Sequence, residues 1–204
     1  MKLNKIEFML MNNPARRLMQ KSLEFKKFKY FLNRNDINLK GKSILDAGCG
    51  SGYSTYLLEK EYSPSKLYAF DLMESQIDLA KKRKLNANFF VGDITKIGVH
   101  EEEFDAVFVF GVLHHVPAWK EAIKEFSRVL KPGGVLLLED MNGDASKFFK
   151  KYFGLDHPNE AFFEWSEFTS HIEDNGLQIL YQEKVVFEGL RTFLCIKPTN
   201  LNNI

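Results

Sequence analysis

The sequence has few of the features that mark secreted, membrane-spanning or metal-binding proteins. Cysteine occurs twice in 204 residues, at Cys49 and Cys195, which excludes a disulfide framework and shows no zinc-ligand spacing. No apolar run approaches the roughly 20 residues that a membrane span needs. Lysines and asparagines interrupt the first residues, where a signal peptide would be apolar. These absences predict a soluble, cytoplasmic protein.

An excess of charge of either sign is also missing. Lysine and arginine total 28 against 27 aspartates and glutamates, which gives a formal net charge of +1. Proteins that bind nucleic acid or anionic membranes usually carry a strong basic excess. We therefore expect no nucleic acid as the partner. The oligomeric state is left open.

What the sequence does have is an alternation of short apolar strands and helices. The predicted strands are residues 43–46, 67–70, 88–91, 104–110 and 135–138, and the helices between them are 53–61, 74–84 and 119–130. Strands that are apolar on both faces and separated by helices indicate a parallel sheet covered by helices on both sides.

The two ends of the chain depart from this alternation. A helix is predicted at 14–32, and a C-terminal helix at 165–175 precedes two strands, 178–187 and 191–197, whose short connection predicts an antiparallel hairpin. The fold class is therefore α/β, a doubly wound, mostly parallel seven-stranded sheet with an antiparallel C-terminal hairpin strand. We expect one domain over 1–204, with an N-terminal helical cap at 1–40 and a lid insertion at 141–165. Aromatic residues are frequent in this insertion and would either wall an apolar pocket or pack as a core.

A glycine loop, Asp46-Ala47-Gly48-Cys49-Gly50-Ser51-Gly52, follows the first predicted strand. Glycine allows a tight turn and close approach of a ligand, and the next helix offers free N–H groups at its start. This alone leaves a dinucleotide and another nucleoside ligand both open. The dinucleotide fingerprint needs Gly or Ala as its sixth residue. Counted from Gly48, that residue is Tyr53, which disfavours NAD.

Polar residues also follow the next strands. Asp71 comes after the second strand, Asp93 after the third, and residues 111–115 after the fourth. Because the carboxyl ends of parallel strands share one edge of the sheet, all of them would meet the glycine loop there. The sequence thus predicts a single site at this edge.

In these motifs the sequence resembles the class I S-adenosylmethionine-dependent methyltransferases, and within them the small-molecule branch that includes the quinone C-methyltransferases. The resemblance covers roughly residues 44–140. It is carried by six segments in order, namely Ile44 to Gly52, Asp71, Gly92 to Ile94, Phe104 to Val107, Val112 to Val116 and Arg128 to Gly134. It implies a Rossmann-like fold and S-adenosyl-L-methionine as the cofactor.

The resemblance also implies a role for each matching position. The loop would hold the methionine part of the cofactor, and the backbone of Phe110 would face its amino group. Asp71 would accept hydrogen bonds from both ribose hydroxyls, which suits a carboxylate. Leu72 and Met73 would flank the adenine ring, with Ile94 nearby, and Asp93 would accept a hydrogen bond from the adenine amino group. The full implied set is Asp46, Gly48, Cys49, Gly50, Gly52, Asp71, Leu72, Met73, Asp93, Ile94 and Phe110.

His114 and His115 are the candidate catalytic residues. An imidazole has the right pKa to act as a base near neutrality. The alternative, which we favour, is that one ring is bonded within the core while the other lines the pocket. No metal site is expected, because the two are adjacent and no third ligand is identifiable. Arg16 and Arg17 would reach a carboxylate of cofactor or acceptor, or would be surface charges.

The predicted activity is in-line transfer of a methyl group to a small, partly apolar or aromatic acceptor. Enzymes that methylate nucleic-acid amino groups resemble one another in an Asn/Asp-Pro-Pro-aromatic motif after the fourth strand. This chain has Phe110-Gly111-Val112-Leu113 there, which disfavours that group. Two other readings stay open: a module that binds the cofactor without catalysis and, less favoured, an NAD-dependent oxidoreductase.

Overall fold

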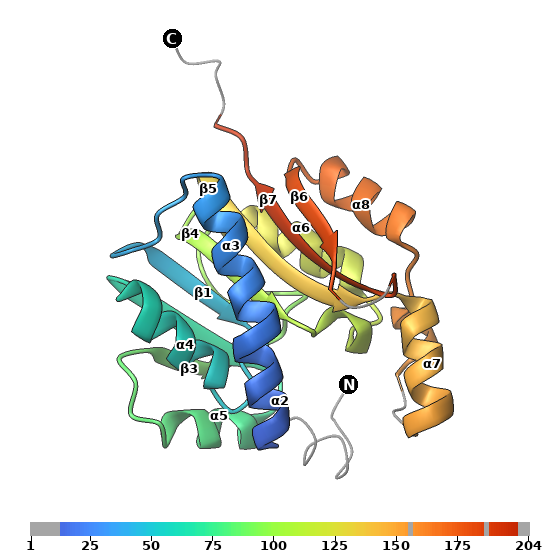
Figure 1. Ribbon diagram of the computed structural model, residues 1–204. Helices are drawn as coiled ribbons and strands as arrows, with labels where there is room; N and C mark the ends of the chain where they lie inside the picture. The colour runs from blue at the N-terminus through green and yellow to red at the C-terminus, as the bar shows by residue number, and fades with distance from the viewer. Residues whose placement is uncertain (1–12, 155–156, 186–187, 200–204) are drawn as a thin grey trace.

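The computed structural model of the protein describes residues 13–154, 157–185 and 188–199 (Figure 1). Its seven-stranded sheet has the order β3-β2-β1-β4-β5-β7-β6. The strands are β1 (Ser43–Ala47), β2 (Lys66–Asp71), β3 (Asn88–Val91), β4 (Phe104–Phe110), β5 (Leu130–Met141), β6 (Gln178–Lys184) and β7 (Leu190–Ile196).

Strands β1 to β5 pair in parallel, whereas β7 runs antiparallel to both of its neighbours. This confirms the predicted fold class, including the antiparallel C-terminal strand. Because β1 and β4 are adjacent while β2 and β5 extend to opposite sides, the connections diverge there. That divergence is the topological switch point at which such sheets bind ligands.

Helices connect and cover the strands. They are α2 (Pro14–Met19), the π-helix η1 (Gln20–Phe25), α3 (Lys26–Arg34), α4 (Tyr53–Tyr62), α5 (Glu74–Lys81), α6 (Trp119–Val129), α7 (Gly143–Phe153) and α8 (Trp165–Asp174), with 3₁₀ turns η2 (Leu113–His115) and η3 (Asn159–Ala161). No helix in the described ranges is both long and apolar enough to cross a membrane.

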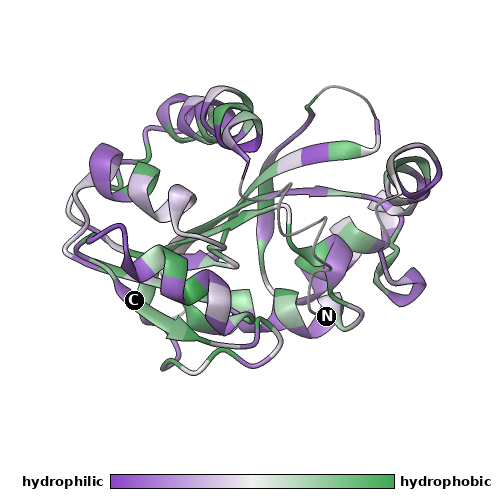
Figure 2. Ribbon diagram, turned by 90° about the horizontal axis from the view of Figure 1, so that it is seen from below, coloured by the Kyte–Doolittle hydropathy of each residue, from purple (hydrophilic) through white to green (hydrophobic). Residues whose placement is uncertain are grey.

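Two hydrophobic layers hold the sheet, one on each face. Alternate strand residues point to opposite faces, so Ile44 packs with α3 and α4 while its neighbour Leu45 packs with α6 and α8. Figure 2 shows hydrophobic residues concentrated in the strands and hydrophilic residues along the flanking helices. Burial on both faces explains why the strands read as continuous apolar runs.

Several element bounds differ from the predictions by one to three residues, and two regions differ in kind. The helix expected at 14–32 continues to Arg34 and contains the π-helical segment η1. Strand β5, predicted to begin at residue 135, begins at Leu130, because Leu130 pairs with Phe104 before the register shifts and regular pairing resumes at Val135. Residues 1–12 of the predicted cap and 155–156 of the predicted lid lie outside the described residues.

Candidate functional site

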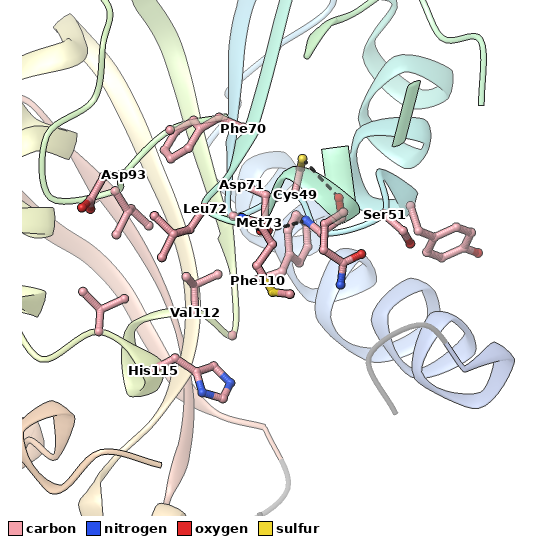
Figure 3. A pocket seen from close by; sticks show the side chains of 18 of the residues that line it. Cys49, Ser51, Phe70, Asp71, Leu72, Met73, Asp93, Phe110, Val112 and His115 are labelled. Atoms are coloured by element: carbon pink, nitrogen blue, oxygen red, sulfur yellow. Dashed lines mark hydrogen bonds between the residues drawn. The ribbon is translucent and has the colours of Figure 1, made fainter. Parts of the chain in front are cut away.

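A cavity of about 340 Å³ opens at the carboxyl edge of the sheet (Figure 3). Its volume lies at the lower end of the range for small-molecule sites. Its walls come from the N-terminal helix and from the segments after β1, β2, β3 and β4. They are Arg16, Arg17, Gln20, Gly48, Cys49, Gly50, Ser51, Tyr53, Phe70, Asp71, Leu72, Met73, Gln76, Gly92, Asp93, Ile94, Thr95, Phe110, Gly111, Val112, His115, Val116, Pro117 and Ala118.

Gly48 lies in the cavity wall, where the loop after β1 meets Val112 of the segment after β4. Its φ of +77° is in the left-handed region, and a Cβ built there would lie 2.6 Å from Cγ2 of Val112. The N–H groups of Gly48 and Cys49 both donate to the carbonyl of Phe70, at 2.9 Å each. The loop is thereby tied to β2, and a side chain at Gly48 would collide with the segment after β4.

Gly52, predicted to bind the cofactor, does not line the cavity. It is the N-cap residue of α4, and a Cβ there would lie 2.9 Å from the Cβ of Ala80 in α5. Its observed contribution is therefore close packing of two helices. Gly50, in contrast, has nothing within 4 Å of such a Cβ and lines the open cavity.

Asp71 joins two of the loops that form the walls. The N–H of Gly50 donates to its Oδ2 (3.0 Å) and the N–H of Met73 to its Oδ1 (2.9 Å). Burial raises the pKa of Asp71, and these two donors oppose that rise. A carboxylate has about four acceptor sites, so two remain for a ligand in the cavity that Asp71 lines.

Asp46 is placed beneath the loop rather than in the cavity wall. It is fully buried, and its Oδ2 accepts from the hydroxyls of Ser54 (2.7 Å) and Thr55 (2.6 Å) in α4. Burial raises its pKa to about 6, although the two hydroxyls lower it. Asp46 thus connects β1 to the first turn of α4, and its Oδ1 has no hydrogen-bond partner among the described residues; its contact with the cofactor stays a prediction.

The remaining implied residues line the cavity as a group: Cys49, Leu72, Met73, Asp93, Ile94 and Phe110. Oδ1 of Asp93 accepts from the N–H (2.8 Å) and hydroxyl (2.7 Å) of Thr95. Burial raises the pKa of the Cys49 thiol well above its ordinary value, and the charges of Asp46 and Asp71 act in the same direction. Cys49 is thus a wall residue and not a thiolate nucleophile.

The residues present fit S-adenosylmethionine. Gly48 lines the cavity without a side chain, where a Cβ would clash with Val112. Asp71 keeps acceptor capacity for paired hydroxyls. Leu72, 44% exposed, and Ile94 give an apolar wall beside Asp93. Figure 3 shows Asp71 and Asp93 on different loops around one space.

The histidine pair lies on η2, on the other side of the cavity. His115 lines it, whereas His114 is buried behind. Nδ1 of His114 lies 2.6 Å from Oδ1 of Asp140, and the N–H of Leu113 donates to Oδ2 of Asp140 (2.6 Å). Burial lowers the pKa of His115, and His114 and His157 act in the same direction. His115 is therefore a neutral imidazole at pH 7.

A third histidine, His157, completes this group and was missed in the sequence. Its ring centroid lies 4.8 Å from those of both His114 and His115. It comes from the predicted lid, far along the chain from the pair, and no local motif marks it. Three imidazoles therefore meet beside the cavity.

A network of buried charged residues lies beneath the His115 side of the cavity. Arg16 makes two hydrogen bonds to Glu24, of 2.7 and 3.1 Å. Burial raises the pKa of Glu139 well above its ordinary value, and the charges of Glu24 and Asp140 add to this, opposed by Arg16. The charge of Arg16 is thus already paired within the protein.

Arg17 differs from Arg16 in its surroundings. It lines the cavity, and its Nε is buried without a hydrogen-bond partner among the described residues. Its guanidinium lies 5.9 Å from the ring centroid of Tyr53. Of the two arginines, Arg17 is the better placed for a ligand carboxylate.

The aromatic insertion divides into two parts. Phe163, Trp165 and Phe168 are buried and pack against Trp119 or Phe193. Phe148 and Tyr152 of α7 are 49% and 61% exposed. None of these side chains is among the cavity-lining residues, so of the two alternatives for these aromatic residues the buried ones follow core packing.

Comparison with known proteins gives consistent matches. The family model of a methyltransferase domain matches residues 45–138. The chain is 31% identical over 158 residues to a ubiquinone biosynthesis O-methyltransferase of Coxiella burnetii, covering 71% of this chain and 67% of that one. It is 29% identical over 143 residues to a demethylmenaquinone methyltransferase of Lactococcus lactis, covering 67% of this chain and 57% of that one.

A solved structure supports the fold. The structure of a SAM-dependent methyltransferase from Aquifex aeolicus superimposes with a TM-score of 0.73 at 20% sequence identity. The alignment covers 96% of this chain and all of that one. At this identity the similarity establishes the architecture, seven-stranded sheet included.

Proposed function

Because the chain belongs to the class I S-adenosylmethionine-dependent methyltransferases, we propose that its acceptor is a small hydroxylated aromatic of the quinone-precursor type. The chain is an enzyme, and its cofactor is S-adenosyl-L-methionine. The acceptor class is supported by the two relatives, which are named for ubiquinone and demethylmenaquinone. The observation that carries it in this chain is a cavity that joins the Asp71 side to the His115 side.

The cofactor half of this cavity would hold the nucleoside. Asp71 would accept from the ribose hydroxyls, and Leu72 with Ile94 would enclose the adenine, whose amino group would donate to Asp93. Gly48 and Gly50 would carry the backbone past the methionine part, and Arg17 would pair with its carboxylate. When bound, the cofactor supplies a methyl group on a positively charged sulfonium.

The acceptor half would position the nucleophile. A hydroxyl must lose a proton as its oxygen bonds to the methyl carbon, while the carbon–sulfur bond breaks and its electrons stay on sulfur. His114 and His115 are the groups we assign to this proton transfer. Asp140 holds Nδ1 of His114, which leaves its Nε2 to accept the proton, while His115, which lines the cavity, would contact the acceptor. Positioning alone supplies roughly 7–11 kcal/mol in such reactions.

The compartment and partners follow from the same features. Both cysteines are buried and free, which suits the reducing cytoplasm, where we place the reaction. Net charge near zero gives no reason to expect nucleic acid as a substrate. We also propose that the chain is a single domain with a cap at 1–40 and a lid at 141–165.

The test is an assay with S-adenosylmethionine labelled in its methyl group and a panel of acceptors. The panel contains a catechol, a hydroquinone, a monophenol and an aliphatic amine. We expect label in the dihydroxylated aromatics, with one S-adenosylhomocysteine formed per methyl transferred. Binding of the cofactor without transfer to any acceptor would instead favour a binding module, and label confined to the amine would contradict the acceptor class.

A further inference from the structure

We propose that His114, His115 and His157 form a binding site for one divalent transition-metal ion of the zinc type. One ring nitrogen from each residue lies within 4.8 Å of the other two. The three ring centroids are separated by 4.1, 4.8 and 4.8 Å. Three imidazoles with a vacant fourth position are the ligand set of one class of catalytic zinc site.

Asp140 gives this cluster the outer support that metal-binding histidines usually have. Its Oδ1 lies 2.6 Å from Nδ1 of His114, and its Oδ2 accepts from the N–H groups of Val112 (3.0 Å) and Leu113 (2.6 Å). A carboxylate fixed in this way orients the imidazole and leaves the other nitrogen, Nε2, for a metal. Asp140 is itself almost fully buried.

His115 supplies an independent indication. Its Nδ1 is buried and has no hydrogen-bond partner within the described ranges. A buried polar atom that makes no bond costs about 1–3 kcal/mol, and coordination of a metal would use it. Because His115 lines the cavity, the vacant position of the ion would be open to the acceptor.

The three rings must draw closer when the ion binds. Nitrogens at about 2.1 Å from a tetrahedral ion are separated by about 3.4 Å, compared with up to 4.8 Å in the cluster. His157 lies between α7 and η3, outside any helix or strand. A shift of about 1 Å in His157 would leave the hydrogen bonds within α7 and η3 in place.

With the ion bound, all three histidines would be ligands, so the ion in place of His114 would assist loss of the proton by holding the acceptor oxygen beside the cofactor. That role rests on the proposed function, whereas the affinity for metal does not. The sequence alone pointed away from a metal, since two adjacent histidines are too few ligands. His157, from the predicted lid, supplies the third ligand.

The experiment uses the full chain without an affinity tag, treated with EDTA, dialysed and titrated with Co²⁺. We expect one Co²⁺ per chain by elemental analysis and the visible absorption of tetrahedral Co²⁺, and an equivalent of Zn²⁺ should displace the Co²⁺ and abolish the absorption. His157→Ala and His115→Ala should each weaken binding at least 100-fold. Asp140→Asn should weaken it about 10–100-fold.

His100→Ala is the matched control, because His100 is exposed and outside the cluster; it should bind Co²⁺ as the wild type does. Cofactor binding by each variant, measured by calorimetry, checks that the fold is intact. If His157→Ala is misfolded, His157→Gln replaces it in the comparison.

Absence of the Co²⁺ spectrum, or equal affinity in wild type and His157→Ala, would overturn the metal site and leave three histidines that act without metal. Such a result with normal cofactor binding would leave the proposed function standing. Metal binding in a protein with no affinity for the cofactor would support the metal site and contradict the proposed function.

Discussion

The two halves of the cavity are built in different ways. The cofactor half comes mainly from short segments that directly follow β1, β2 and β3, neighbours in the sheet, and its contacts link these adjacent loops, such as those of Asp71 with Gly50 and Met73. The acceptor half joins segments far apart in sequence: His114 with Asp140 and His157, and the Arg16–Glu24 pair with Glu139.

This difference matches the division of chemistry between the two halves. The cofactor is common to all its users, and a fixed loop geometry serves each of them. The acceptor differs between enzymes, and a surface assembled from several segments can change one segment at a time. Substitutions in the two halves should therefore have separable effects.

The largest expected effect comes from the acceptor half. His114→Ala should lower kcat by about 10²–10⁴-fold, the usual contribution of a general base, while the Kd for S-adenosylmethionine stays unchanged. Steady-state kinetics and calorimetry on the same preparation measure both values. Wild-type turnover in both His114→Ala and His115→Ala would remove these residues from the mechanism.

The reverse pattern is expected for Asp71→Ala. Loss of an acceptor shared by two hydroxyls and two loops should raise the Kd for the cofactor by about 100-fold, or roughly 3 kcal/mol. Asp78→Ala is the control, since Asp78 is exposed on the adjacent helix α5. Equal cofactor affinity in the two variants, measured by calorimetry, would contradict the assignment of Asp71 as the ribose acceptor.

Gly48→Ala should affect both halves, because the added Cβ meets Val112. We expect a loss of about 1–3 kcal/mol in the free energy of unfolding, together with weaker cofactor binding. Gly176→Ala has a similar φ of +76° but open space around it, so it measures backbone strain alone. The double variant Gly48→Ala/Val112→Ala should recover part of the loss in urea denaturation; no recovery would contradict the predicted collision.

The smallest effect concerns Asp46. Its pKa of about 6 lies above the ordinary 3.8, so ionisation destabilises the native state, and stability present below pH 4 is lost as the pH rises through 6. The unfolding free energy of wild type should fall by about 1–2 kcal/mol relative to Asp46→Asn between pH 5 and pH 8. Parallel pH profiles from urea denaturation would show that Asp46 does not titrate there.

Much of the fold was predictable, because strands buried on both faces appear as apolar runs. β3 and β4 match their predicted bounds. The π-helix η1 and the irregular start of β5 were not predicted. Both depend on packing between distant segments, which local periodicity does not report.

The site was predictable where spacing determines position. Motif spacing brought Asp71 and Asp93 to one edge, but it does not say where a side chain points, so it did not show that Asp46 and Gly52 stand outside the cavity lining. His157 had no signal at all, since it meets His115 through the tertiary fold alone.

The most direct test of the central claim is a crystal structure with S-adenosylhomocysteine. We predict both ribose hydroxyls on the carboxylate of Asp71 and the sulfur directed toward the His115 side of the cavity. A nucleoside bound elsewhere, or one that makes no contact with Asp71, would contradict the account.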